Sequence, residues 1–148
     1  MTEKAEEELR KLSVEIRILE ETAEAIQARI NMVNAVISDL NYASMTLEGL
    51  EKEKENAELL IPIGGNSYIK AKLEKPDKVT VGIGAGVSVE KTLQEAKEII
   101  KKRLEELEKS RISLQQQLSQ VVNRISENRE RFEKLVATLR KGTPAKNV

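Results

Sequence analysis

Three alternating glycines, Gly82, Gly84 and Gly86, form the pattern most suggestive of chemistry, because glycine-rich loops bind the phosphates of nucleotides. A dinucleotide-binding loop has glycines at its first, third and sixth positions and leads into a helix. Here the sixth position is Val87, another strand pattern follows it, and the chain contains no Gly-Lys-Ser/Thr triplet. The glycines therefore indicate a hairpin loop, with one glycine placed where another strand comes close.

Runs of glutamate offer a second possible chemistry, the binding of cations. They occupy residues 6–8, 51–55 and 105–106. Each run is mixed with or followed by Lys or Arg at helical spacing, which is typical of a solvated helix face. Carboxylates that act as acid and base need burial, and these runs have no apolar surroundings. We expect solvated helix faces here and no metal site.

The residue types that are missing exclude whole classes of reaction. The 148 residues include no His and no Cys, so the chain has no Ser/His/Asp or Cys/His nucleophile pair. The same absence excludes imidazole and thiolate metal ligands and any disulfide framework. We therefore expect a protein that is not an enzyme, with no catalytic residues, no bound metal and no cofactor.

The charge balance limits the partners. There are 25 basic and 25 acidic side chains, so the chain has no general attraction for nucleic acid or anionic lipid. No stretch approaches the roughly 20 apolar residues that a membrane span needs. We expect a soluble cytoplasmic protein that binds neither nucleic acid nor membrane. Glu and Lys are abundant whereas Asp is rare, a bias associated with hyperthermophiles.

Two long segments carry the apolar spacing of a coiled coil, in steps of three and four residues. They predict helices over 2–56 and 92–141, followed by a frayed tail at 142–148. Thr92 and Glu95 have the spacing of a helix-capping box, and Gly142 with Pro144 is typical of a helix end. The first seam comprises Leu9, Leu12, Ile16, Leu19, Ala23, Ile26, Ile30, Val33, Ile37, Leu40, Ser44 and Leu47. The second comprises Leu93, Ile100, Leu104, Leu107, Arg111, Leu114, Leu118, Val121, Ile125, Asn128, Phe132, Leu135 and Leu139.

The two seams match when they are written antiparallel, with Leu9 opposite Leu139 and Ile16 opposite Phe132. This predicts one long intramolecular coiled coil with both chain ends at its far end. Three seam positions are polar: Ser44, Arg111 and Asn128. Polar seam residues fix the register of coiled coils at some cost in stability. An alternative is that the coil opens there to a ligand, and nothing in the sequence favours it.

Between the helices, over residues 58–90, the apolar period changes to two, which indicates strands. Residues 59–63 and 67–73 flank a Gly-Gly-Asn turn, and residues 79–83 and 87–90 flank the Gly84–Gly86 loop, so we expect two hairpins. A reverse turn with Pro76 at its second position joins them.

Two hairpins of this size are marginal alone, and the coil within one chain covers little of their apolar surface. The economical solution is to pair and stack hairpins from several chains, so we expect an obligate oligomer with a β platform and protruding coils. The residues expected to drive assembly are Leu59, Ile61, Ile63, Ile69, Val81, Ile83 and Val87.

The whole pattern resembles the α class of archaeal prefoldins. The distinctive parts are Leu60-Ile61-Pro62-Ile63-Gly64 and Val81-Gly82-Ile83-Gly84-Ala85-Gly86-Val87, set between two coil helices. Two hairpins resemble the α class, whereas the β class has one. Gly65-Asn66 departs from the Ala-Gly that relatives often carry, which leaves the turn type open.

The resemblance implies a mainly α fold with a small β part, in which a long antiparallel two-helix coiled coil is joined by two β-hairpins that build an oligomeric β-barrel platform. It also implies partners: two α-type subunits with four β-type subunits, forming six coils. Such proteins hold unfolded proteins without ATP and deliver them to a group II chaperonin. A filament-forming α-like paralogue exists in the family, so a structural protein, a filament or scaffold, is the alternative.

The free end of the coil is the expected client-binding site. A two-helix coil lacks neighbours there, and fraying would expose a small, adaptable apolar surface. Alternatively, the same residues only complete the coil or pack on a neighbouring coil. The candidate client-binding residues are Leu9, Leu12, Val14, Ile18, Phe132, Val136 and Leu139.

Overall fold

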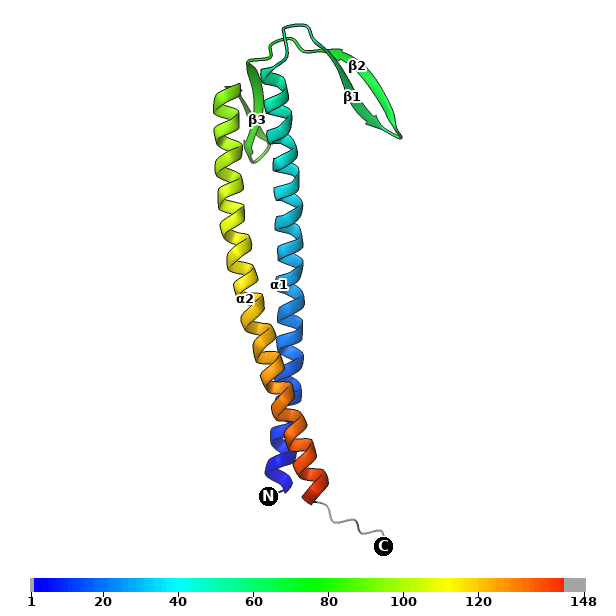
Figure 1. Cartoon of the computed structure of the whole chain (residues 1–148), viewed down its shortest axis with the longest axis vertical. Helices are drawn as coiled ribbons and strands as arrows, with labels where there is room; N and C mark the ends of the chain where they lie inside the picture. The colour runs from blue at the N-terminus through cyan, green and yellow to red at the C-terminus, as the bar shows by residue number, and fades with distance from the viewer. Residues whose placement is uncertain (1, 143–148) are drawn as a thin grey trace. The chain divides into compact units, whose positions relative to one another are not determined.

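The computed structural model describes residues 2–142, and the chain folds into two long helices with two hairpins between them (Figure 1). Helix α1 spans Thr2–Glu51 and helix α2 spans Leu93–Gly142. Between them lie β1 (Glu58–Gly64), β2 (Ser67–Lys72), β3 (Lys78–Gly84) and β4 (Val87–Thr92). Gly142 ends α2, and the rest of the expected frayed tail, 143–148, lies outside the described residues.

The chain divides into two compact units. Unit 1 contains residues 2–34 and 109–142, and unit 2 contains residues 35–108. Unit 1 therefore consists of the N-terminal part of α1 and the C-terminal part of α2. Unit 2 contains the remainder of both helices together with the two hairpins.

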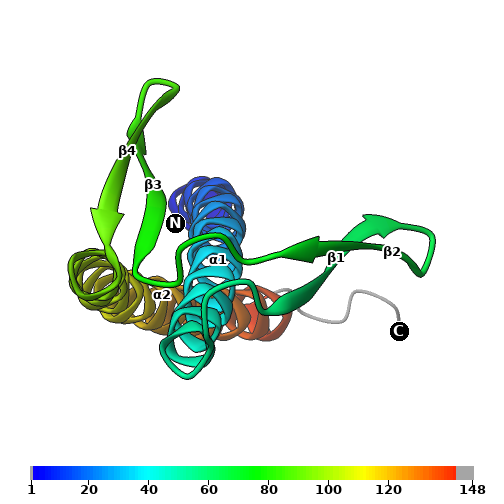
Figure 2. The same ribbon diagram turned by 90° about the horizontal axis from the view of Figure 1, so that it is seen from above.

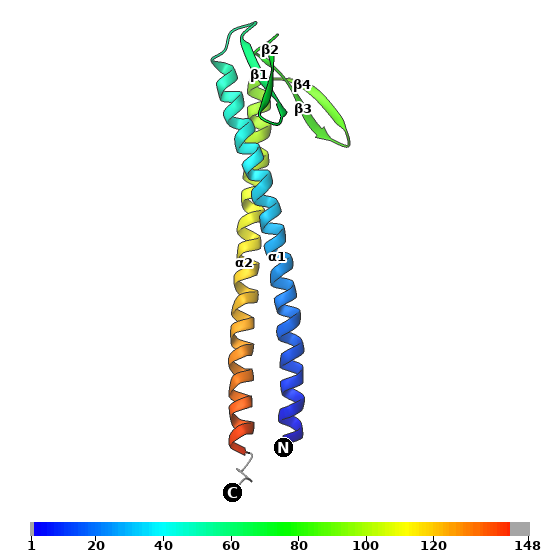
Figure 3. The same cartoon turned by 90° about the vertical axis from the view of Figure 1, so that its right-hand side faces the viewer.

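In unit 1 the helices lie side by side and antiparallel, as Figures 1 and 3 both show. Arg131 pairs with Glu8 at 3.1 Å, and Arg124 pairs with Glu15 at 3.4 Å. Glu15 follows Glu8 by one heptad along α1, whereas its partner Arg124 precedes Arg131 by one heptad along α2. An antiparallel coil requires this opposite order. The predicted seam residues of unit 1 are buried or half-buried in the described structure, which confirms the seam.

The ion pairs Glu15–Arg124 and Glu20–Arg129 bracket Ile16 on α1 and Asn128 on α2, so Ile16 faces Asn128 and the predicted partner Phe132 lies about one turn away. This register leads to a crosslinking test. Cysteines at Ile16 and Asn128 should form a disulfide within one chain, because facing seam residues approach within disulfide range. The measurement is the shift in electrophoretic mobility after oxidation, and the chain has no native Cys to compete. The matched control pairs cysteines at Ile16 and Leu118, since Leu118 lies about 15 Å along α2 from Asn128. A crosslink in the control alone would refute the register.

The core of unit 2 joins one hairpin to both helices. Its buried residues are Leu47, Val81, Leu93, Ala96 and Ile100, with Val79 and Ile99 packed against them. Val79 and Val81 alternate along β3, so one face of this strand lies on the helices. The guanidinium of Arg103 donates a hydrogen bond to the carbonyl of Gly82 at 2.7 Å. The second hairpin is therefore anchored to the helices by apolar packing and a hydrogen bond.

Each hairpin forms its own two-stranded antiparallel sheet, β1 with β2 and β3 with β4 (Figure 2). This confirms the two predicted hairpins. Both hairpins contain the same irregularity, a shift in strand pairing just before the loop, at Ile63 in the first hairpin and at Ile83 in the second. Both loops have two residues. Gly65 and Asn66 have φ of 56° and 59°, which identifies the type I′ turn that the sequence left open.

The connections at the ends of the helices explain where the helices stop. Helix α1 ends at Glu51 and not at Asn56 as expected, because Asn56 joins the first hairpin. The N–H of Asn56 donates to the carbonyl of Leu73 at 2.7 Å, and Asn56 has a positive φ of 66°. The Nζ atom of Lys97 lies 2.6 Å from the Glu51 carboxylate and holds the pKa of that carboxyl below its usual value. This ion pair offsets the unfavourable placement of an acid at a helix C-terminus.

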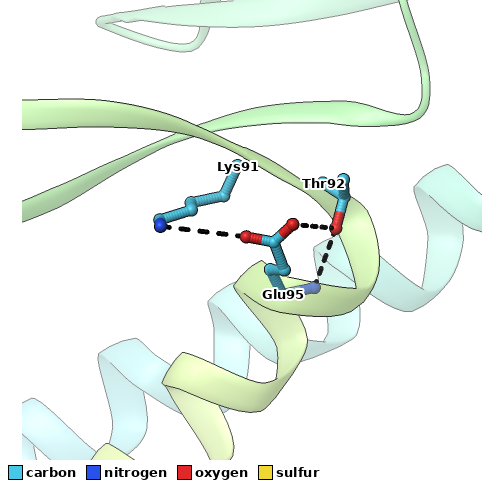
Figure 4. Close-up of polar contacts among 3 residues, drawn as sticks. All are labelled: Lys91, Thr92 and Glu95. Atoms are coloured by element: carbon cyan, nitrogen blue, oxygen red, sulfur yellow. Dashed lines mark hydrogen bonds and ion pairs between the residues drawn. The ribbon is translucent and has the colours of Figure 1, made fainter.

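The predicted cap of α2 is confirmed. The N–H of Glu95 donates to the hydroxyl oxygen of Thr92 at 3.1 Å, and the hydroxyl donates to the Glu95 carboxylate (Figure 4). Lys91 adds an ion pair to the same carboxylate at 3.8 Å. The predicted reverse turn before β3 is also present, with the N–H of Lys78 donating to the carbonyl of Lys75. A cap of this kind stabilises a helix by about 1 kcal/mol.

Candidate functional site

The coil tip, defined here as the end of unit 1 that holds Thr2 and Gly142, contains the seven candidate client-binding residues. Two of them lie off the seam: Val14 is 48% exposed and Ile18 is 54% exposed. Leu12 is only 3% exposed and belongs to the seam. The remaining four, Leu9, Phe132, Val136 and Leu139, are half-buried. The structure therefore offers Val14 and Ile18 directly, whereas Leu12 becomes accessible only if the coil opens.

Two shallow hollows lie at the coil tip. One is lined by Val14 and Ile18 together with Arg10, Lys11 and Glu15. The other is lined by Phe132, Val136 and Ala137 together with Glu133, Arg140 and Lys141. Each hollow combines apolar side chains with charged residues at its rim. Such open, partly apolar surfaces suit binding to irregular apolar segments and are too open to enclose a small molecule.

The first hairpin exposes apolar side chains. Ile61 is 44% exposed, Ile63 and Ile69 are also exposed, and Leu59 is half-buried. Leu60 and Tyr68, on the other face of this hairpin, are also exposed and were not among the residues predicted to drive assembly. Alternation along the strand could have identified both, because a strand with apolar residues on its two faces needs cover on each.

The predicted assembly residues of the second hairpin differ in their exposure to solvent. Ile83 and Val87 are exposed, but Val81 is 7% exposed and packs in the core of unit 2. The expectation that Val81 lacks cover within its own chain is therefore wrong. The sequence did not show this, because the packing depends on β3 folding back onto the helices, which are distant in sequence from the strand.

Further exposed apolar residues lie along the helices and were not selected from the sequence. They do not belong to the seams, so a search for heptads passes over them. The largest exposures are those of Met32, Tyr42 and Met45, and the others are Val36, Ile112 and Val122. Of the three polar seam residues, Asn128 is buried, and within residues 2–142 its Nδ2 atom has no hydrogen-bond partner. Ser44 and Arg111 are half-buried.

The described part of the chain, residues 2–142, contains no group of three or more potential metal-ligating side chains. Within the same residues no helix is both long enough and apolar enough to cross a membrane. The features that the structure does present are a coiled coil with apolar hollows and two hairpins with exposed apolar faces.

Comparison with known proteins assigns this arrangement to a family. The sequence profile of the prefoldin subunit family matches residues 19–138, which include both hairpins and most of both helices. The chain belongs to the prefoldin family. Relatives named prefoldin subunit alpha place this prefoldin in the α class. The expected archaeal and thermophilic character fits these relatives.

Two relatives and one solved structure illustrate how much of the prefoldin is covered. Prefoldin subunit alpha of Methanopyrus kandleri is 37% identical over 113 residues, which cover 76% of this chain and 72% of the relative. That of Methanococcoides burtonii is 36% identical over 126 residues, covering 85% of this chain and 91% of the relative. A cryo-EM structure of filamentous PFD from Methanocaldococcus jannaschii superimposes with a TM-score of 0.68 at 28% identity, covering 78% of this chain and 95% of that one.

Proposed function

We propose that this prefoldin is a subunit of an ATP-independent chaperone that holds non-native polypeptides at its coil tip. The observation that carries the proposal is the exposure of Val14 and Ile18 beside the charged rim of their hollow. When an unfolded chain covers apolar side chains that were exposed to water, apolar surface is removed from water and binding is favourable. Contacts of this kind need no nucleotide, because binding itself supplies the driving force.

The half-buried residues of the coil tip extend this surface. Phe132 and Val136 line the second hollow, and the end of a two-helix coil opens at low cost because it has packing partners on one side only. Opening would add Leu9, Leu12 and Leu139 to the apolar area. An adaptable surface of variable size suits clients that share apolar character and no fixed sequence.

Assembly is the second part of the proposal. The exposed apolar residues of the hairpins support a platform in which they are covered by other prefoldin subunits, in the form of a β-barrel with two α-type and four β-type chains. Family membership supports two further parts of the proposal, delivery of clients to a group II chaperonin and a cytoplasmic location. The same platform would leave the coil tips free for clients.

A filament is the second candidate function, and the similarity to the filamentous PFD of Methanocaldococcus jannaschii favours it. Co-expression with a prefoldin subunit that has a single hairpin, followed by native mass measurement, separates the two. A discrete hexamer supports the chaperone subunit. A ladder of increasing masses supports the filament.

The proposed binding surface is tested by replacing Val14 and Ile18 with Ser. Suppression of aggregation of a chemically unfolded protein should fall severalfold when every α-type coil carries the change, because the exposed apolar area is lost. Light scattering measures the aggregation. The matched control replaces Val36 and Ile112 with Ser, since these residues are of the same types and similarly exposed but lie away from the coil tip. Equal loss in both variants would contradict a site at the coil tip.

A further inference from the structure

A shallow groove in unit 1, away from the coil tip, has a composition that the proposed function does not yet use. Its apolar floor consists of Met32, Val33 and Leu114, contributed by both helices. Met32 is 70% exposed, so an apolar and unusually flexible side chain faces solvent. The hydroxyls of Ser110 and Ser113 also line the groove. These short side chains leave the groove open on the α2 side.

The charges around the groove differ from those elsewhere in unit 1. Arg29 and Lys109 both line it, one from each helix, and no acidic residue does. Elsewhere in unit 1 the helices are bridged by pairs of opposite charge, Glu8 with Arg131, Glu15 with Arg124 and Glu20 with Arg129. Within residues 2–142 neither Arg29 nor Lys109 forms an ion pair.

Two like charges bordering one groove repel each other, and an anion placed between them removes that repulsion. An apolar floor adds a requirement for apolar surface on the same ligand. A free inorganic anion would leave the floor uncovered, and a purely apolar segment would leave the cations unpaired. The complementary ligand therefore carries a carboxylate next to apolar side chains.

We infer that this groove binds segments of non-native polypeptide in which Asp or Glu alternates with apolar residues. The inference rests on the proposed function, because it assigns a second client-binding surface to the same subunit. Met32, Val33 and Leu114 contact the apolar side chains, and Arg29 and Lys109 pair with the carboxylates. The wall of the coil then selects clients by charge, whereas the coil tip binds them by apolar area.

The test uses the full chain assembled with its partner subunits and a short fluorescein-labelled peptide in which Leu alternates with Glu. A second peptide carries Gln in place of every Glu. Fluorescence anisotropy gives both dissociation constants. The Glu peptide should bind about tenfold more tightly than the Gln peptide, and added salt should shrink this difference because it screens exposed charges.

The double variant Arg29→Gln with Lys109→Gln should remove the preference for the Glu peptide. The matched control, Lys101→Gln with Lys102→Gln, changes the net charge equally on exposed residues of α2 that do not line the groove, and should keep the preference. A photoreactive group attached at Ser113→Cys should crosslink the Glu peptide to this position, which is feasible because the chain has no other Cys.

Several results would overturn the inference. Equal binding of both peptides by the wild-type assembly would do so, and so would an unchanged preference in the Arg29 and Lys109 variant. A change of oligomeric mass in that variant would show that the groove is an interface between coils. Failure of the groove is distinguishable from failure of the proposed function, because suppression of aggregation by the wild-type assembly is measured in parallel and does not require a charge preference.

Discussion

Replacing Ile61 and Ile83 together with Asp is expected to leave the chain folded but unable to assemble. Both side chains are exposed in the single chain, so the charges remain hydrated there and cost little. In the proposed platform the same positions are covered, and each uncompensated charge costs several kcal/mol. Native mass measurement should show free subunits, and circular dichroism should show unchanged helix content.

The control for this experiment places Asp at Ser67 and Ser88, exposed polar positions on the same hairpins, and should leave assembly intact. Val81→Asp provides the contrast. Val81 is buried in the core of unit 2, so a charge there should destabilise the fold itself and reduce thermal stability as well as assembly. A wild-type oligomer formed by the Ile61 and Ile83 variant would refute the platform.

Removing the coil tip is expected to abolish most holding activity while preserving the oligomer. Deleting residues 1–18 and 132–148 removes all seven candidate client-binding residues, Val14 and Ile18 included. The seam from Leu19 to Leu47 remains, so the shortened coil should still form, and the hairpins are untouched. Suppression of aggregation is measured with every coil of the assembly trimmed, since intact partner tips would compensate in part.

The control deletes residues 143–148 only and leaves the described coil tip complete. It should retain full activity. Undiminished suppression by the fully trimmed assembly would place client binding elsewhere, on the coil walls or on the platform. If trimming also lowers the number of subunits in the oligomer, the loss of activity has another cause and the prediction fails.

The sequence by itself determined the elements and their order. The three- and four-residue spacing of the seams predicts two paired helices, because a narrow apolar stripe on one helix is buried by packing against a partner helix. Thr92 and Glu95 fix the start of α2 through contacts within one turn. Gly64 and Gly84 each stand at the end of a strand, directly before a hairpin loop. These features depend on residues close together in the chain, where local geometry decides the outcome.

The tertiary structure alone decided which apolar residues are covered. Val81 and Ile83 are neighbours on one strand with similar side chains, yet one is buried in the core of unit 2 and the other is exposed. Arg29 and Lys109 are distant in sequence, and only the pairing of α1 with α2 brings them to one groove. Helix α1 stops at Glu51, and Asn56, which the sequence placed in this helix, instead bonds to Leu73 across the first hairpin. The burial of Val81 and the clustering of these charges arise from contacts between elements, and local spacing alone did not reveal them.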